Sequence, residues 1–145
     1  MNFYIDNSDI SILEIFTFIN ANSFENFDED FLTLYSKKIF EYANIITFRD
    51  TIDNKIIGFA AYYDNAPEKK YVYITFIGVS KDFRNKGIAS GLLRQIELVA
   101  KQKGFHGIKL EVRTDNINAK MFYEKRGFVF CDYASTVSEY LIKDL

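Results

Sequence analysis

The chain has 145 residues, of which 48% are apolar and 26% are charged, and its formal net charge is −2. This composition predicts a single globular domain over 1–145 and excludes a disordered chain, because enough apolar surface is present to offset the entropy of folding. Seven Gly, one Pro and one Cys exclude collagen-like and disulfide-rich scaffolds. The small negative charge disfavours nucleic acid as the main partner.

Apolar residues change their period along the chain and predict a series of helices and strands. In chain order these are a strand over 2–5, helices over 10–22 and 29–43, strands over 45–49, 56–63 and 71–79, a helix over 87–103, a strand over 108–113, a helix over 119–126, and strands over 128–133 and 137–142. The order β-α-α-β-β-β-α-β-α-β-β joins strand–helix–strand units to hairpins. The predicted fold class is therefore α/β, a mixed sheet with helices on both faces.

The first two helices carry the local signals of helix ends and of a buried face. Asp9 and Asp28 are predicted as their N-terminal caps. The second helix is expected to bury an apolar stripe made of Phe31, Leu34, Tyr35 and Tyr42.

The sequence also predicts a cytoplasmic protein without membrane contact. The lone Cys131 cannot form an internal disulfide, which fits a reducing compartment, and its place on a predicted strand suggests a buried, inert thiol. No apolar run approaches the ~18 residues of a membrane span. The N-terminus lacks the basic start and apolar stretch of a secretory signal.

Charge is distributed unevenly along the chain. Residues 1–70 carry 12 acidic and 6 basic residues, a net charge of −6, whereas residues 81–109 carry 7 basic and 2 acidic residues, a net charge of +5. A basic segment in a small protein favours the binding of one anionic group. A solvated helix face would have the same composition, so composition alone leaves both interpretations open.

The first chemical signal is the loop Arg84-Asn85-Lys86-Gly87-Ile88-Ala89, between the strand 71–79 and the long helix. The first N–H groups of a helix have no intrahelical partner, and the helix dipole favours an anion there. Gly87 allows close approach of an oxyanion, Ala89 keeps the next turn narrow, and Arg84 and Lys86 add charge. These features predict a diphosphate site.

Other phosphate-binding patterns do not fit this loop. Lys86 precedes Gly87, whereas a Walker loop ends in Gly-Lys followed by Ser or Thr. The three glycines of a dinucleotide-binding fingerprint are absent. The remaining alternative is a plain helix start with a glycine and basic flanks.

The second signal lies in residues 110–128, LEVRTDNINAKMFYEKRGF. A strand ends there, a polar turn follows, and a short helix carries Tyr123 before Gly127 turns the chain into the next strand. A buried aromatic hydroxyl can donate a proton to a leaving group. The alternative is a core tyrosine whose hydroxyl is bonded to backbone.

Together the two signals resemble the GNAT superfamily of N-acetyltransferases. The family pattern of the first loop is Arg or Gln, two residues, Gly, one residue, then Gly or Ala, and Arg84, Gly87 and Ala89 fit it. The second pattern is fitted by Asn116, Ala119, Phe122, Tyr123, Glu124, Lys125, Gly127 and Phe128. The resemblance covers 72–130, and the element order extends it to the whole chain.

The resemblance implies that acetyl-CoA binds where two central parallel strands, 71–79 and 108–113, splay apart. The pyrophosphate would lie on residues 84–90 and the pantetheine along 77–79, and Asn116 or Asn118 would reach the pantetheine or its thiol end. The implied coenzyme-binding residues are Ile77, Gly78, Val79, Arg84, Asn85, Lys86, Gly87, Ile88, Ala89, Ser90, Asn116, Asn118 and Tyr123. No metal is implied, and the single His, His106, excludes a His-based metal site.

The resemblance also implies the catalytic residues. Tyr123 corresponds to the general acid that protonates the departing thiolate. Many family members carry a glutamate base on the strand before the loop, but the strand 71–79 has no carboxylate, so Glu111 is the candidate base. The alternative is an ordered water chain by way of Tyr73 or Thr75.

The predicted function is transfer of acetyl from acetyl-CoA to a primary amine by direct attack. A small-molecule amine is favoured, because the chain shows no long peptide-docking insertion, and the acidic 1–70 segment favours a neutral or cationic acceptor. Two alternatives are a protein N-terminal or lysine acetyltransferase and a non-catalytic acyl-CoA-binding module. Aromatic residues expected near the acceptor pocket are Phe24, Phe27, Phe31, Tyr35 and Tyr42. A homodimer is left open.

Overall fold

The computed structural model describes residues 2–4 and 10–145. Within these residues the strands are β1 Asn2–Tyr4, β2 Asn44–Arg49, β3 Ile56–Tyr63, β4 Tyr71–Val79, β5 Gly107–Arg113, β6 Val129–Tyr133 and β7 Ser138–Asp144. The α-helices are α1 Ile12–Asn22, α2 Glu29–Tyr42, α3 Ile88–Gln102 and α4 Ile117–Glu124, and two short 3-10 turns lie at Pro67–Lys69 and Lys81–Phe83. The predicted order of elements is confirmed, and most boundaries differ by one or two residues.

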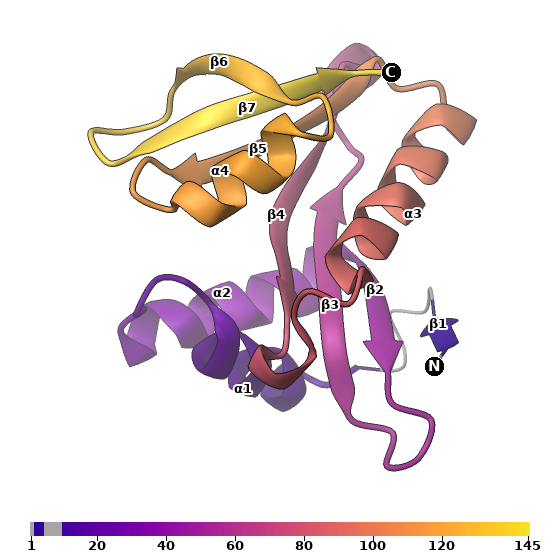
Figure 1. Ribbon diagram of the computed structural model, residues 1–145, viewed down its shortest axis with the longest axis vertical. Coiled ribbons are helices and arrows are strands. Elements are labelled where there is room, and N and C mark those ends of the chain that lie inside the picture. The colour runs from indigo at the N-terminus through magenta and orange to yellow at the C-terminus, as the bar shows by residue number, and fades with distance from the viewer. Residues whose placement is uncertain (1, 5–9) are drawn as a thin grey trace.

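The described strands form one mixed sheet in the order β1-β2-β3-β4-β5-β7-β6 (Figure 1). Strands β1 to β4 are antiparallel to their neighbours, β4 and β5 are parallel, and β5, β7 and β6 are again antiparallel. The parallel β4–β5 pair requires a crossover, and α3 supplies it. The predicted α/β class with a mixed sheet is confirmed.

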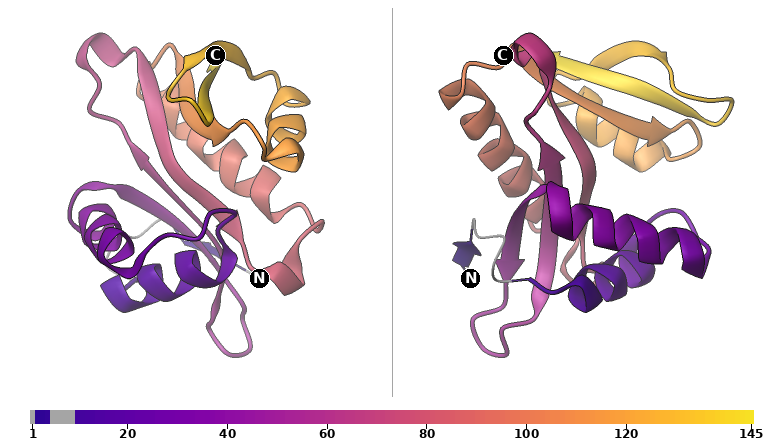
Figure 2. Two further views of the ribbon diagram at one scale, coloured as in Figure 1. Left: turned by 90° about the vertical axis from the view of Figure 1, so that its left-hand side faces the viewer. Right: turned by 180° about the vertical axis from the view of Figure 1, so that it is seen from behind.

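Helices cover both faces of the sheet (Figure 2). On one face α1 and α2 pack over β2 to β4, with a core that includes Ile15, Ile19, Leu32, Ile39, Ile45 and Phe59. On the other face α3 and α4 cover a core that includes Ile74, Leu92, Ile96, Ile108, Leu110 and Phe128. Alternating side chains of the central strands feed the two cores.

Two expectations about the first helices need revision. The cap of α1 is Ser11, whose hydroxyl accepts from the Glu14 N–H while the Glu14 carboxylate accepts from the Ser11 N–H; Asp9 lies outside the described residues. Asp28 caps α2 as predicted.

The expected apolar stripe of α2 was wrong. The residues that α2 buries are Leu32, Ser36 and Ile39. Of the predicted stripe, Tyr35 is half-buried, and Phe31, Leu34 and Tyr42 are exposed. The helix has apolar residues on more than one side, so its period alone did not identify the buried side.

The start of α3 packs closely on β3 because Gly58 has no side chain. A Cβ atom at Gly58 would lie 2.8 Å from Ile88 Cγ2, closer than real side chains approach. Ile88 is the first residue of α3 and is buried. Gly58 therefore helps to fix the helix N-terminus beside the end of β4.

The central parallel pair separates halfway along its length. The register of β4 with β5 runs from Tyr71↔Gly107 to Ile74↔Leu110 and stops there. Beyond Ile74, β4 stays paired with β3 as far as Val79, while β5 stays paired with β7 as far as Arg113. Figure 1 shows β5, β7 and β6 turning away from the lower part of β4. The splay predicted between 71–79 and 108–113 is present.

A β-bulge marks the point of separation. Ala61 is opposite Phe76 and Tyr62 is opposite Ile74, so Thr75 is the extra residue in β4. The Tyr35 hydroxyl of α2 lies 2.6 Å from the Thr75 carbonyl oxygen, to which it donates, and 2.9 Å from Thr75 Oγ1. Bulges bend a strand and redirect its neighbours, and here the bulge turns the end of β4 away from β5.

The C-terminal edge strand β6 differs from expectation. Every residue of β6 is exposed, including Cys131. The predicted buried thiol is therefore wrong, because β6 is the last strand of the sheet and no helix covers its side chains. None of the described helices is long and apolar enough to cross a membrane.

Candidate active site

A cleft of about 930 Å³ opens where β4 and β5 separate. Its walls come from the loop after α1, from the end of β4, from the loop and first turn of α3, from the end of β5 and from α4. The two sequence motifs, which are about thirty residues apart in the chain, therefore line the same cleft.

One end of the cleft is the N-terminus of α3. Gly87 precedes the helix with φ of +81° and Asn85 has φ of +62°, so two residues in the left-handed region turn the backbone into the helix. The Gly91 N–H donates to the Gly87 carbonyl at 3.0 Å, and the N–H groups of residues 88–90 precede that bond. No side chain caps the helix, and its first turn has no acidic residue. The positive end of the helix dipole therefore faces the cleft without an internal counter-charge.

The coenzyme-binding residues implied by the resemblance surround this cleft with one exception. Those that line it are Ile77, Gly78, Val79, Arg84, Asn85, Gly87, Ile88, Ala89, Ser90, Asn116, Asn118 and Tyr123. Lys86 is not among the lining residues, and its Nζ lies 5.2 Å from the centre of the Phe83 ring. The expected charge contribution of Lys86 at the cradle is not supported by this position.

Arg84 has a structural contact in addition to its charge. Its Nε donates to the Val79 carbonyl at 3.2 Å and its Nη2 donates to the Asn22 carbonyl at 2.8 Å. The Lys81 N–H also donates to Asn22 Oδ1 at 3.1 Å. These bonds connect the loop between β4 and α3 to the end of α1.

Tyr123 lies in the cleft wall on α4. The residue is only 8% exposed and packs against the Phe122 and Phe128 rings, with centroid separations of 5.2 and 5.4 Å. Burial raises the pKa of its hydroxyl above the ordinary tyrosine value. The hydroxyl therefore stays protonated at neutral pH and is available as a donor.

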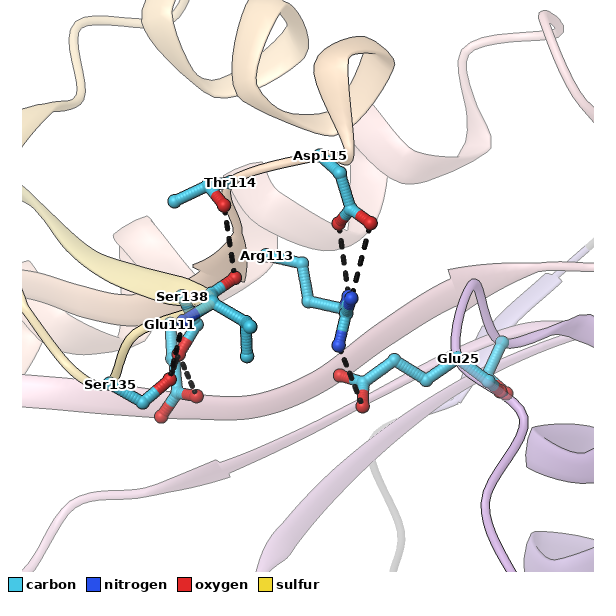
Figure 3. Close-up of polar contacts among 9 residues, drawn as sticks. Glu25, Glu111, Arg113, Thr114, Asp115, Ser135 and Ser138 are labelled. Carbon is cyan, nitrogen blue, oxygen red and sulfur yellow. Dashed lines mark hydrogen bonds and ion pairs between the residues drawn. The ribbon is translucent and has the colours of Figure 1, made fainter.

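Glu111 lies on the far side of the splay, on β5. Its side chain lines the cleft and accepts a hydrogen bond of 2.8 Å at Oε2 from the Ser138 hydroxyl (Figure 3). Ser138 is buried and its hydroxyl lies 2.9 Å from that of Ser135. This contact fixes one carboxylate oxygen on the β7 side. Burial, followed by the charge of Glu111, raises the pKa of nearby Tyr73 to about 12.

Arg113 spans the cleft mouth beside Glu111. Its guanidinium forms two bonds with Asp115, of 3.0 and 3.1 Å, and its Nη1 lies 3.9 Å from Glu25 Oε2 in the loop between α1 and α2 (Figure 3). The two carboxylates on this arginine leave Glu111 as a further negative charge at the mouth. Asn116 is partly committed, because its Oδ1 accepts from the Ala119 N–H as the cap of α4.

Aromatic residues form part of the wall of the same cleft. Phe24, Phe27 and Tyr35 line the cleft, whereas Phe31 and Tyr42 do not. Phe27 stacks on Phe31 at 5.1 Å and Phe31 stacks on Tyr35 at 5.7 Å, which makes a continuous row from the loop before α2 into the helix. This end of the cleft therefore combines apolar rings with carboxylates.

Sequence reasoning missed two residues of the site and one contact. Arg126 lines the cleft beside Ser90, and Ser138 holds Glu111. Tyr35 was expected near the acceptor pocket, but its bond to the bulge was not predicted. Only Arg126 had a usable signal, because it lies three residues after Tyr123, in the turn that directly follows α4. The other two contacts join residues 27 and 40 positions apart.

Among the described residues, no group of three or more His, Cys, Asp or Glu side chains could hold a metal ion. His106, the only histidine, is exposed and is not among the residues that line the cleft.

A mixed sheet that splits between two parallel strands, with an uncapped helix N-terminus at the split, is the GNAT type of fold. The profile of the acetyltransferase (GNAT) family matches residues 12–128. The chain belongs to this family.

Individual relatives agree with this assignment. Streptothricin acetyltransferase A of Bacillus subtilis (strain 168) is 41% identical over 59 residues, which is 41% of this chain and 34% of that protein. A protein of Bacillus anthracis str. Ames, assigned as a streptothricin acetyltransferase and crystallised with acetyl coenzyme A, is 31% identical with a TM-score of 0.62, over 72% of this chain and 63% of that one.

A third similarity covers nearly the whole fold. The ribosomal-protein-S18-alanine N-acetyltransferase from Escherichia coli has a TM-score of 0.77 and 16% identity, over 99% of this chain and 92% of that one. The chain spans between a third and a half of the length of the first curated relatives it matches.

Proposed function

We propose that this protein is an N-acetyltransferase that transfers acetyl from acetyl-CoA to a primary amine by direct attack. The observation that carries the proposal is a single cleft that joins the uncapped α3 N-terminus, the unpaired edge of β4 and the buried Tyr123 hydroxyl. The family to which the chain belongs and the acetyl coenzyme A in the related Bacillus anthracis structure support it.

The residues of the cleft suit the coenzyme along its length. N–H groups at the start of α3 would bind the pyrophosphate, since several donors converge there beside the positive end of the helix dipole. The edge of β4 beyond Ile74 has lost its β5 partner, so its peptide groups can bond to the amides of the pantetheine. The bend at Thr75 aims the thioester end toward Tyr123 and Glu111.

The reaction then needs two proton transfers and correct placement. The acceptor nitrogen forms a bond to the thioester carbonyl carbon, the C–S bond breaks, and the sulfur leaves with the electron pair. Tyr123 donates its proton to the leaving sulfur, and Glu111 takes the proton released by the nitrogen. Holding the two reactants in one cleft supplies the larger part of the acceleration.

Glu111 is a better candidate base than a water chain through Tyr73 or Thr75. Tyr73 is not among the cleft-lining residues, and Thr75 Oγ1 is already bonded to the Tyr35 hydroxyl. Glu111 lines the cleft and has one oxygen, Oε1, outside its bond to Ser138.

The acceptor is proposed to be a small, cationic or neutral amine. Glu25 and Glu111 attract a protonated amine, and Phe24 and Phe27 supply apolar surface at the same end of the cleft. Similarity to streptothricin acetyltransferases, whose acceptor is a small molecule, supports this class. The acceptor end lies among exposed residues, so an acceptor can enter without unfolding of the loop after α1.

A protein N-terminus is the second candidate acceptor. It is favoured by the position of Glu111 in the cleft and by the fold shared with the ribosomal-protein-S18-alanine N-acetyltransferase. A non-catalytic acyl-CoA-binding module would retain the coenzyme cleft without turnover.

Binding and turnover experiments separate these candidates. Thermal unfolding with saturating acetyl-CoA or CoA is expected to show stabilisation of about 2.7 kcal/mol at 100 times the dissociation constant. A panel of free amines and of short peptides, each with acetyl-CoA, should release CoA only with free amines. Release with peptides alone would support the second candidate, and binding without release would support the binding module. No stabilisation at millimolar ligand would contradict the coenzyme site itself.

A further inference from the structure

We infer that Arg126 is a pre-organised residue of the coenzyme site that contacts a phosphate. Ser90 and Phe122 hold its side chain beside the N-terminus of α3. This inference rests on the proposed coenzyme site and adds to it a cation supplied by the turn that follows α4. The chemistry that Arg126 would recognise is a phosphate group of the coenzyme, in its diphosphate or on its ribose.

The guanidinium is held by three hydrogen bonds and by one aromatic ring. Its Nε and Nη2 donate to Ser90 Oγ at 3.1 and 2.5 Å, and its Nη1 donates to the Phe122 carbonyl at 2.9 Å. Its central carbon lies 3.7 Å from the centre of the Phe122 ring. Ser90, Phe122 and Arg126 all line the cleft. A side chain held at four points loses little further freedom when it binds a ligand.

The guanidinium has two N–H donors that these three bonds do not use. Arginine has five N–H donors, and the three bonds above use one on each nitrogen, so one N–H on Nη1 and one on Nη2 remain. Two parallel N–H groups match two oxygens of a phosphate. No carboxylate among the described residues lies within 4 Å of the guanidinium.

The electrostatic setting favours an anion at this point. Ser90 lies in the first turn of α3, so the Arg126 charge is held next to the positive end of the helix dipole. Two positive features side by side are unfavourable unless a negative group lies between them. The partly buried position of Arg126 reduces screening by water and salt and strengthens this preference.

Arg126 also connects the coenzyme phosphates to the proposed acid. Its backbone N–H donates to the Tyr123 carbonyl at 3.0 Å, so the turn that carries the guanidinium is bonded to the last turn of α4, which carries Tyr123. A phosphate bound by Arg126 and by the start of α3 would therefore hold α4 at a fixed distance from α3, and with it Tyr123.

The experiment measures coenzyme affinity in Arg126→Gln, in Ser90→Ala and in the control Arg94→Gln. Arg94 lies on α3, is exposed and does not line the cleft, so its change removes the same charge elsewhere on the molecule. Calorimetric titrations with CoA, dephospho-CoA and pantetheine are carried out at two salt concentrations. Thermal unfolding without ligand checks that each variant is folded.

Arg126→Gln is expected to weaken CoA binding about tenfold or more, to leave pantetheine binding within twofold of wild type, and to make CoA binding less sensitive to salt. Ser90→Ala should give a smaller loss, because the charge remains but its anchor is gone, and Arg94→Gln should give none. A loss with CoA but not with dephospho-CoA assigns the contact to the ribose phosphate, and a loss with both assigns it to the diphosphate.

Two results would overturn the inference while leaving the proposed function intact. Equal weakening of CoA and pantetheine would mean that Arg126 only supports the fold of α4. Unchanged CoA affinity and salt dependence in Arg126→Gln would mean that Arg126 contacts no phosphate. Wild-type protein that bound neither CoA nor pantetheine would instead contradict the proposed function, and this inference with it.

Discussion

Tyr123 on α4 and Glu111 on β5 both line the cleft that opens between β4 and β5, and their surroundings suit opposite roles. Tyr123 is enclosed by Phe122 and Phe128, and burial keeps its proton in place by raising its pKa. Glu111 is exposed to the cleft, with one oxygen bonded to Ser138. A group that keeps its proton suits the acid, and an accessible carboxylate suits the base.

Replacement of Tyr123 by Phe should lower kcat at least tenfold, because the leaving sulfur loses its proton donor, with little change in the affinity for CoA. Steady-state kinetics and CoA titration measure the two quantities. Tyr133→Phe is the matched control, since Tyr133 is exposed on β6 and outside the cleft, and it should change neither. An equal fall in kcat and in CoA affinity would give Tyr123 a structural role only.

Replacement of Glu111 by Gln should slow the reaction mainly at low pH, where the amine arrives protonated and needs a base. Ser138→Ala should also slow the reaction, but by less than Glu111→Gln, because the carboxylate remains and only the hydrogen bond that orients it is lost. Profiles of kcat/KM against pH measure both effects. Unchanged profiles in both variants would exclude Glu111 as the base.

At the scale of elements, two glycines with the same backbone conformation bound helix α3. Gly87 has φ of +81° before the helix and Gly104 has φ of +79° after it, and a Cβ atom at either would meet no atom within 4 Å. Only Gly87 lines the cleft. The same conformational cost thus applies at both ends of the helix, but only one end faces the proposed coenzyme.

Gly87→Ala and Gly104→Ala should each destabilise the fold by about 1 kcal/mol, because a side chain is disfavoured at positive φ. Only Gly87→Ala should also weaken CoA binding, since its methyl group points into open space that the pyrophosphate would take. Urea denaturation and CoA titration of both variants test the pair. Equal CoA affinity in the two would argue against a diphosphate at this loop.

At the scale of the whole molecule, an ion pair far from the cleft joins the central hairpin to the end of α3. Asp64, just after β3, accepts from Lys103 Nζ at 2.5 Å and from Asn44 Nδ2 at 3.0 Å. The Lys103 hydrogen bond is the main cause that lowers the pKa of Asp64, and the bond from Asn44 adds to it. Because the folded pKa lies below the ordinary value of 3.8, this stabilisation is fully present above that value and is lost as the pH falls through the folded pKa.

Asp64→Asn should therefore cost up to about 1 kcal/mol of unfolding free energy at neutral pH and less as the pH falls below about 4. Thermal unfolding between neutral pH and about pH 2 follows the difference between variant and wild type. The exposed change Glu41→Gln, on α2, serves as a control for the loss of one negative charge. A difference that stayed constant with pH would exclude the ion pair as its cause.

Local patterns determined the elements of this protein and the two loops that border its cleft. The order of helices and strands, the Asp28 cap and the left-handed Gly87 before α3 depend on residues a few positions apart, so they could be predicted from the chain alone. The family motifs around Arg84 and Tyr123 are local for the same reason. Their proposed roles remain predictions that the variants above test.

Only the tertiary structure decided which side chains meet across the cleft and which faces are covered. Ser90 meets Arg126, Tyr35 meets Thr75 and Ser138 meets Glu111 across 27 to 40 residues of chain. The exposed β6 and the buried face of α2 were likewise mistaken from period alone. Such contacts depend on strand register, on a one-residue bulge and on how each helix docks against the sheet, and these are fixed by packing among elements that no local pattern records.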